Sequence, residues 1–164
     1  MQILNQRQIT QKINRLAIEI LENNYDANEI ILAGINNNGM SFARMVYAAL
    51  DVVTGIPLIL TQIKLDPALP LSEEVRVGIP LEMMHDKVVI LVDDVANTGR
   101  TIFYAFKPLM NIVPKKVEVA VLVDRTHKSF PVQVDYVGLS LATTLKENIE
   151  VQLRDVQEPA VFLN

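Results

Sequence analysis

The 164-residue sequence predicts an α/β fold in which a parallel β-sheet carries helices on both faces. Apolar runs of strand length alternate along the chain with segments that repeat apolar residues at helical spacing. Two of the runs, 88–92 and 117–123, the second apolar except for Glu118, lead directly into acidic residues. Ligands of such sheets bind at the carboxyl ends of the strands. We therefore expect one crevice, faced by the loops after Ala33, Val92, Val123 and Val137.

The composition is that of an ordinary globular domain, with 50% hydrophobic and 21% charged residues. We expect one domain over residues 1–164, because this length supports a single sizeable core. The sequence contains no cysteine, which excludes disulfides, thiolate catalysis and cysteine-type zinc sites. We find neither a signal peptide nor an apolar run long enough to cross a membrane, so a cytoplasmic setting is expected.

The first third of the chain predicts helix, strand, helix and strand in turn. Residues 5–22 form an amphipathic helix, with Asn5 as its N-cap and Gln8 three residues later. A short strand over 29–34 precedes a polar loop over 35–39, and 40–50 returns to helical spacing. A second strand follows over 58–63.

The segment 64–80, which we call the arm, differs from its surroundings because it contains three prolines and few bulky apolar residues. We expect it to be a small mobile hood or an extended hairpin. A strand over 88–92 and a helix to about Ile112 follow, with Pro114 ending that helix. Further strands are expected over 117–124, 134–137, 149–153 and 160–163.

The most informative motif runs without interruption from Val88 to Thr101. It consists of a buried strand, the acidic pair Asp93 and Asp94, and a polar turn containing Thr-Gly-Arg-Thr. Backbone amides and hydroxyls of such a turn bind phosphate, and the carboxylates accept hydrogen bonds from sugar hydroxyls or bind Mg²⁺. Acids that only cap a helix, or the acidic cluster of a response-regulator receiver, would not require this turn.

This motif resembles the phosphoribosyl pyrophosphate (PRPP) signature of the type I phosphoribosyltransferases. The resemblance implies that family's parallel-sheet fold, with helices on both faces and a small hood. It also implies that Asp93 and Asp94 bind the ribose hydroxyls, directly or through Mg²⁺ as the cofactor. The turn would hold the 5-phosphate of PRPP through six successive residues: Ala96, Asn97, Thr98, Gly99, Arg100 and Thr101.

Nearly the whole chain is similar to the bacterial pyrimidine-operon attenuation regulators, which are also uracil phosphoribosyltransferases. The similarity is carried by 9–19, 31–35 and 121–132, with Val-Asp-Arg-Thr-His at 123–127 the most specific part. It implies a pyrophosphate loop, a base site and a closing arm that contains Lys64, which we predict to be catalytic with Asp93 and Asp94. The loop comprises Asn36, Asn37, Asn38 and Gly39, and the base site Asp124, Arg125, Tyr136, Val137 and Gly138.

Two departures bear on activity. The family carries a basic residue immediately before the glycine of the pyrophosphate loop, where this chain has Asn38. The arm is also short and holds only Lys64 and Arg76 as basic residues. One hypothesis is an enzyme that transfers phosphoribose from PRPP to a pyrimidine, uracil being favoured, to give UMP and pyrophosphate. The alternative is a weak or inactive enzyme that acts as an RNA-binding or nucleotide-sensing regulator of pyrimidine genes.

Two partner questions stay open at this level. Arg7, Lys12 and Arg15 do not share one stripe of the first helix, so they form either a solvated face or part of an RNA-contacting surface. We expect a homo-oligomer, in which the apolar positions of 40–50 contribute either to packing within the chain or to a dimer contact. The net charge of −4 argues against wholesale binding of nucleic acid.

Overall fold

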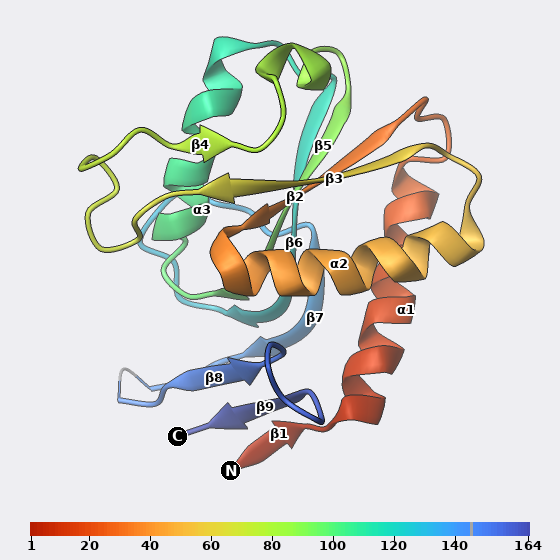
Figure 1. Cartoon of the computed structure of the whole chain (residues 1–164). Helices are drawn as coiled ribbons and strands as arrows, with labels where there is room; N and C mark the ends of the chain where they lie inside the picture. The colour runs from red at the N-terminus through yellow and green to blue at the C-terminus, as the bar shows by residue number, and fades with distance from the viewer. Residues whose placement is uncertain (145) are drawn as a thin grey trace.

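The computed structural model describes residues 1–144 and 146–164, which form a six-stranded sheet and a separate three-stranded sheet (Figure 1). The order of the large sheet is β4-β3-β2-β5-β6-β7, and the order of the small sheet is β1-β9-β8. The strands of the large sheet are β2 (Ile30–Ile35), β3 (Leu58–Lys64), β4 (Arg76–Val77), β5 (Val88–Ala96), β6 (Lys116–Arg125) and β7 (Tyr136–Leu141). Those of the small sheet are β1 (Gln2–Leu4), β8 (Ile149–Gln152) and β9 (Ala160–Leu163).

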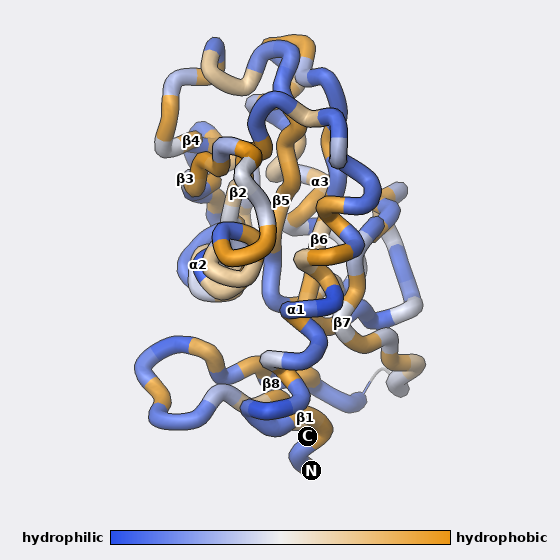
Figure 2. The backbone as a smooth tube through the Cα atoms, turned by 90° about the vertical axis from the view of Figure 1, so that its right-hand side faces the viewer, coloured by the Kyte–Doolittle hydropathy of each residue, from blue (hydrophilic) through white to orange (hydrophobic). Residues whose placement is uncertain are grey.

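Helices cover both faces of the large sheet, which confirms the predicted α/β class. Residues of β5 alternate between the two faces: Ile90 belongs to a core with α1 (Gln6–Asn23) and α2 (Asn36–Val53), and Leu91 to a core with α3 (Arg100–Ala105). Two 3₁₀-helices, η1 (Leu81–Met84) and η2 (Lys107–Asn111), also lie on the α3 face. Figure 2 shows the apolar strands β2, β5 and β6 in the interior. In the part of the chain described, no helix has the length and apolar character needed to span a bilayer.

Helix α1 begins where the sequence predicts. The Asn5 side chain accepts a hydrogen bond from the Gln8 amide, and the Gln8 side chain accepts one from the Asn5 amide, both at 2.9 Å. This reciprocal capping box satisfies two amides that the first helical turn leaves without partners. The buried face comprises Ile9, Ile13, Leu16, Ala17 and Ile20.

The prediction of a polar loop over 35–39 is wrong. Helix α2 begins at Asn36, directly after β2. Two glycines allow this abrupt start. A Cβ on Gly34 would lie 2.6 Å from the Met40 Cα, and a Cβ on Gly39 would lie 2.7 Å from the Val92 carbonyl oxygen. The first turn of α2 therefore packs against the backbone of β2 and β5, where a side chain would not fit.

Two further element boundaries also differ from the prediction. The helix expected to reach Ile112 ends at Ala105, and η2 follows with Pro108 in its first turn, where proline is tolerated. The acidic pair lies within β5, which continues to Ala96, because β6 pairs with β5 along this stretch.

The last strands do not all extend the parallel sheet. Strand β7 joins it, beginning at Tyr136, but β8 and β9 pair antiparallel with each other, and β9 pairs with β1. Strand β1 has no counterpart among the predicted strands. Together these three strands bring both termini to the bottom of Figure 1.

The arm is an extended hairpin, which is one of the two predicted possibilities. Strand β4 pairs antiparallel with the end of β3, matching Ile63 with Val77 and Lys64 with Arg76. The intervening loop projects at the left of Figure 1.

Replacing Asn5 by Ala should lower the free energy of unfolding by about 1 kcal/mol, because it removes the N-cap acceptor. Urea unfolding followed by circular dichroism would measure this loss. The matched control is Asn14→Ala in the exposed middle of α1, where alanine favours the helix and should be neutral or stabilising. Equal effects of the two substitutions would contradict a capping role.

Candidate active site

A crevice of about 510 Å³ lies at the carboxyl edge of the large sheet. It brings together three of the sequence-predicted elements: the start of α2, the acidic pair and the turn after β5. Its lining residues are Ile35, Asn36, Asn37, Asn38, Pro67, Asp93, Asp94, Val95, Asn97, Thr101, Ile149 and Arg154. The parallel register explains this gathering, because β2 and β5 run side by side and end at the same edge.

The acidic pair is held by the backbone of its own strand. Asp93 Oδ1 accepts a hydrogen bond from the Asp94 amide, and Asp94 Oδ1 accepts one from the Val95 amide, both at 2.9 Å. Asp93 is only 8% exposed. Burial, followed by the charge of Asp94, raises the pKa of Asp93 well above its ordinary value, and burial also raises the pKa of Asp94. Both carboxyl groups are therefore poorly solvated, which disfavours their charged form. A bound cation or sugar hydroxyls would stabilise that charged form.

These two carboxylates offer oxygen ligands of the kind that Mg²⁺ prefers. No group of three or more metal-ligating side chains occurs within residues 1–144 and 146–164. A magnesium ion would thus take most of its ligands from substrate oxygens and water, as Mg²⁺ sites commonly do.

The turn after β5 encloses a small cavity of about 50 Å³, lined by residues from Asp93 and Val95 to Ile102. Gly99 has a φ of +86°, in the left-handed region, and a Cβ there would lie 3.2 Å from the Val132 side chain. The Thr98 carbonyl accepts hydrogen bonds from the amides of Ser129 and Phe130, at 3.0 and 3.2 Å. The segment after β6 therefore fixes the turn in place.

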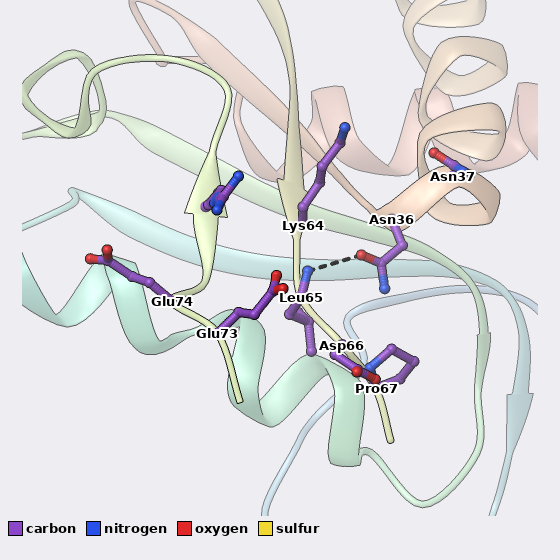
Figure 3. A pocket seen from close by; sticks show the side chains of 9 residues that line it. Asn36, Asn37, Lys64, Leu65, Asp66, Pro67, Glu73 and Glu74 are labelled. Carbon is purple, nitrogen blue, oxygen red and sulfur yellow. Dashed lines mark hydrogen bonds between the residues drawn. The ribbon is translucent and has the colours of Figure 1, made fainter. Parts of the chain in front are cut away.

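The arm stands beside the crevice and is tied to it at two points. The Leu65 amide donates to Asn36 Oδ1 at 3.0 Å (Figure 3), and the Arg100 guanidinium donates to the Ala68 carbonyl at 3.3 Å. Lys64 lies at the end of β3 and lines an adjoining cavity of about 400 Å³, together with Arg76 of the arm. Pro67 lines both cavities, so the arm forms part of their shared border.

Three of the residues predicted to frame a base, Tyr136, Val137 and Gly138, are not among the described residues that line the crevice. Tyr136 starts β7, is 1% exposed and donates its hydroxyl to Glu118 at 2.8 Å in the core beneath α1. The carbonyls of Val137 and Gly138 accept hydrogen bonds from Arg15, each at 3.1 Å. Arg15 accordingly has a structural partner within the chain. Across β6, Tyr136 is level with Val92 and Val137 is level with Asp93, because Ala120 and Val121 pair with both strands. Their predicted role at a base stays a prediction.

Asp124 and Arg125 end β6 next to the crevice but are occupied by other contacts. Asp124 forms an ion pair with Lys128 at 2.6 Å, and Arg125 donates to the Glu147 carbonyl at 2.7 Å. Arg125 therefore supports the segment that leads into β8.

Two residues that were not predicted as site residues, Ile149 and Arg154, line the crevice from the side of the small sheet. Ile149 begins β8 and is mostly buried, and Arg154 lies in the loop between β8 and β9. No local motif marks either residue, because their place depends on how the small sheet docks beside the large one.

A family model described as Phosphoribosyl transferase domain matches residues 1–156. The chain belongs to this family. Two similar curated relatives are both called Bifunctional protein PyrR. The relative from Macrococcus caseolyticus is 33% identical over 163 residues, covering 95% of this chain and 93% of the relative. That from Streptococcus pyogenes serotype M49 is 38% identical over 149 residues, covering 88% of this chain and 84% of the relative.

Solved phosphoribosyltransferases share the fold. The Trypanosoma cruzi hypoxanthine phosphoribosyltransferase superposes with a TM-score of 0.78 at 18% identity, covering 98% of this chain and 95% of that one. A hypoxanthine-guanine phosphoribosyltransferase from Bacillus anthracis superposes with a TM-score of 0.69 at 20% identity. The match covers 85% of this chain and 81% of that one. At these identities the likeness supports the type I phosphoribosyltransferase fold alone.

Asp93→Asn should stabilise the ligand-free, metal-free protein at neutral pH. The raised pKa means that the folded state holds a proton that the unfolded state has already released, so stability falls as pH rises above the ordinary pKa of aspartate. Asparagine removes that cost, which amounts to about 1.4 kcal/mol for each pH unit between the two pKa values. Urea unfolding between pH 4 and 8, in a metal chelator, should show a gain over wild type that grows with pH. A gain independent of pH would contradict this assignment.

Proposed function

We propose that this phosphoribosyltransferase transfers the phosphoribosyl group of PRPP to uracil, giving UMP and pyrophosphate. The observation that carries the proposal is the single crevice that joins the buried acidic pair, the Thr-Gly-Arg-Thr turn and the first turn of α2. The choice of uracil rests on the resemblance to the pyrimidine-operon regulators and on the relatives called PyrR.

We place the 5-phosphate of PRPP in the turn of residues 96–101. Helix α3 is only six residues long, so the turn's own amides and the hydroxyls of Thr98 and Thr101 must do most of the binding. The ribose hydroxyls would then lie against Asp93 and Asp94, and the diphosphate against Asn36, Asn37, Asn38 and Gly39. This order follows the crevice from the end of β5 toward the start of α2.

Phosphoribosyltransferases of this family generally use Mg²⁺ with PRPP, and Asp93 and Asp94 are the residues that would hold it here. When bound, the ion would neutralise charge on the diphosphate and so favour its departure. The residues of the chain would do the rest by positioning and electrostatics.

The reaction requires no side-chain nucleophile. As the C1–O bond to pyrophosphate loosens, positive charge develops on the ribose, and the carboxylates of Asp93 and Asp94 stabilise that charge. The ring nitrogen of the base then bonds to C1 as the C1–O bond breaks, and its proton passes to water or to the released pyrophosphate. We propose that the apolar side chain of Ile149, which lines the crevice, contacts the base, and that the arm carrying Lys64 closes over the leaving group to exclude water.

A second activity is suggested by the name Bifunctional protein that the relatives carry. The alternative hypothesis is an RNA-binding or nucleotide-sensing regulator of pyrimidine genes, with weak or no turnover. A mobility-shift titration with a pyrimidine-operon leader RNA, with and without UMP, would test this role. Binding that UMP strengthens would support it, and the absence of binding under both conditions would contradict it.

Pyrophosphate release from PRPP on addition of uracil, in Mg²⁺, tests the enzyme directly. Thr98→Val removes a hydroxyl donor from the phosphate turn and should weaken PRPP and UMP binding by about tenfold to a hundredfold, the effect of one hydrogen bond to a charged group. Calorimetry would measure it. Thr126→Val, at an exposed position after β6, is the matched control. Unchanged affinity of the Thr98 variant would contradict the assignment of this turn.

Asn38→Arg should raise kcat/KM for PRPP. Arginine adds a planar cationic donor where the family carries a basic residue, and a charge-assisted hydrogen bond is about twice as strong as a neutral one. Steady-state kinetics with uracil would measure the gain, about threefold to thirtyfold if one such bond forms. If activity is too low to measure, PRPP affinity serves instead. No gain in either quantity would mean that the start of α2 does not face the diphosphate.

A further inference from the structure

A short stretch of the arm is held at both ends by segments of the candidate site. The Leu65 amide donates to Asn36 Oδ1 at 3.0 Å, at the start of α2 (Figure 3). Three residues later in the arm, the Ala68 carbonyl accepts a hydrogen bond from the Arg100 guanidinium at 3.3 Å, in the phosphate turn. Pro67, which lies between these two bonds in the sequence, lines the crevice. This stretch therefore borders the crevice from the start of α2 to the phosphate turn.

The loop of the arm also has internal hydrogen bonds. Asp66 Oδ1 accepts hydrogen bonds from the amides of Ala68 and Leu69, at 2.9 and 3.2 Å. A side chain that accepts from amides two and three residues later stabilises a turn. The Ser72 hydroxyl donates to the Leu69 carbonyl at 2.6 Å. The arm thus orders its own turn, and its bond to Arg100 sets the position of that turn beside the crevice.

The backbone and the side chain of Arg100 contact different segments. Its amide donates to Thr98 Oγ1 at 3.4 Å, within the phosphate turn, whereas its guanidinium donates to the Ala68 carbonyl of the arm. Among the residues described, Asn97 and Thr101 of this turn line the large crevice and Arg100 does not. The side chain of Arg100 is therefore directed to the arm.

We propose that the Arg100 side chain positions the arm at the crevice and does not bind the 5-phosphate. The proposal rests on the proposed function, because it leaves the phosphate to the amides of the turn and the hydroxyls of Thr98 and Thr101. A phosphate bound to those groups would order the turn, and the bond from Arg100 would then fix the arm. Recognition of the substrate and exclusion of water are thereby joined at one residue.

The position of the arm can be measured directly, because the chain contains no cysteine. Leu69 is 63% exposed, so a nitroxide label attached to Leu69→Cys reports on the arm alone. In this labelled protein, Arg100→Met removes the charge and the donors but keeps an unbranched side chain. The ratio of mobile to immobilised label in the electron paramagnetic resonance spectrum should rise about two- to tenfold, the effect of one hydrogen bond.

Two further variants control this measurement. Arg100→Lys keeps the charge and can still donate to the arm, so it should restore part of the immobilised population. Arg7→Gln, at an exposed position in the first turn of α1, removes the same charge far from the arm in sequence and should leave the spectrum unchanged.

Two functional measurements separate positioning of the arm from binding of the phosphate. Calorimetry should show unchanged UMP affinity for Arg100→Met, because the amides and hydroxyls of the turn remain. Release of the arm should also let water compete with uracil for PRPP. In that side reaction a water oxygen bonds to C1 as the C1–O bond to pyrophosphate breaks, and the proton of the water passes to solvent. The ratio of ribose 5-phosphate to UMP among the products should therefore rise in this variant.

The contrary results are distinguishable. A label spectrum that Arg100→Met leaves unchanged overturns the proposal, and so does a loss of UMP affinity, because Arg100 would then bind the phosphate. Release of the arm without a change in the product ratio overturns the role in excluding water. If wild type binds neither PRPP nor UMP, the proposed function fails, whereas the label spectrum still shows whether Arg100 holds the arm.

Discussion

The close contact between the first turn of α2 and the ends of β2 and β5 is the constraint on which the site depends. Gly34 and Gly39 both lie in this contact, and a Cβ on either would come within 3 Å of neighbouring backbone. Because no side chain intervenes, three consecutive asparagines begin the helix at the floor of the crevice. The same contact places Gly39 against Asp93, whose carboxylate oxygen lies 3.1 Å from where a Cβ would be. This packing thus sets the distance between the first turn of α2 and the acidic pair.

The acidic pair destabilises the ligand-free protein, whereas the same two carboxylates can bind a ligand. Two neighbouring carboxylates in the interior of a strand are poorly solvated, and their raised pKa values record that cost. A ligand that supplies hydroxyl donors or a cation would remove this desolvation cost. Part of the binding free energy would then come from stabilising carboxylates that are poorly solvated in the free protein. Strand β5 pairs with β2 as far as Val92 and with β6 through Asp93, so the backbone that carries the acids is held within the sheet.

The sequence predicted well those features that depend on nearby residues. The alternation of apolar runs predicted β2, β3, β5 and β6, and the pair Asn5 and Gln8 predicted the start of α1. The signature turn was found because its chemistry is local. By contrast, the start of α2 depends on glycine contacts across strands, and asparagine repeats gave no helical signal. The sequence predicted that the arm alone would form a hood beside the crevice. In the structure both the arm and the small sheet border the crevice.

The position of the base stays a prediction. Tyr136 looked suitable by type and position, yet its side chain turns into the core and donates to Glu118, because alternation along β7 directs it beneath α1. Ile149 and Arg154 gave no signal, since their place follows from pairing between distant strands and not from a motif. Residues that complete a crevice from a second sheet are therefore the ones that sequence reasoning alone tends to overlook.

The small sheet also has a consequence for the order of assembly. A hydrogen bond of its first strand, from the Met1 amino group to the Leu163 carbonyl, joins residues 162 positions apart. During synthesis the large sheet and α2 can form before β1 pairs with β9, because contacts between residues so far apart in the sequence form later than local contacts. The wall that carries Ile149 and Arg154 is then added last. A nascent chain would hold the acidic pair and phosphate turn before it had a complete pocket, which delays ligand capture until translation of this region has ended.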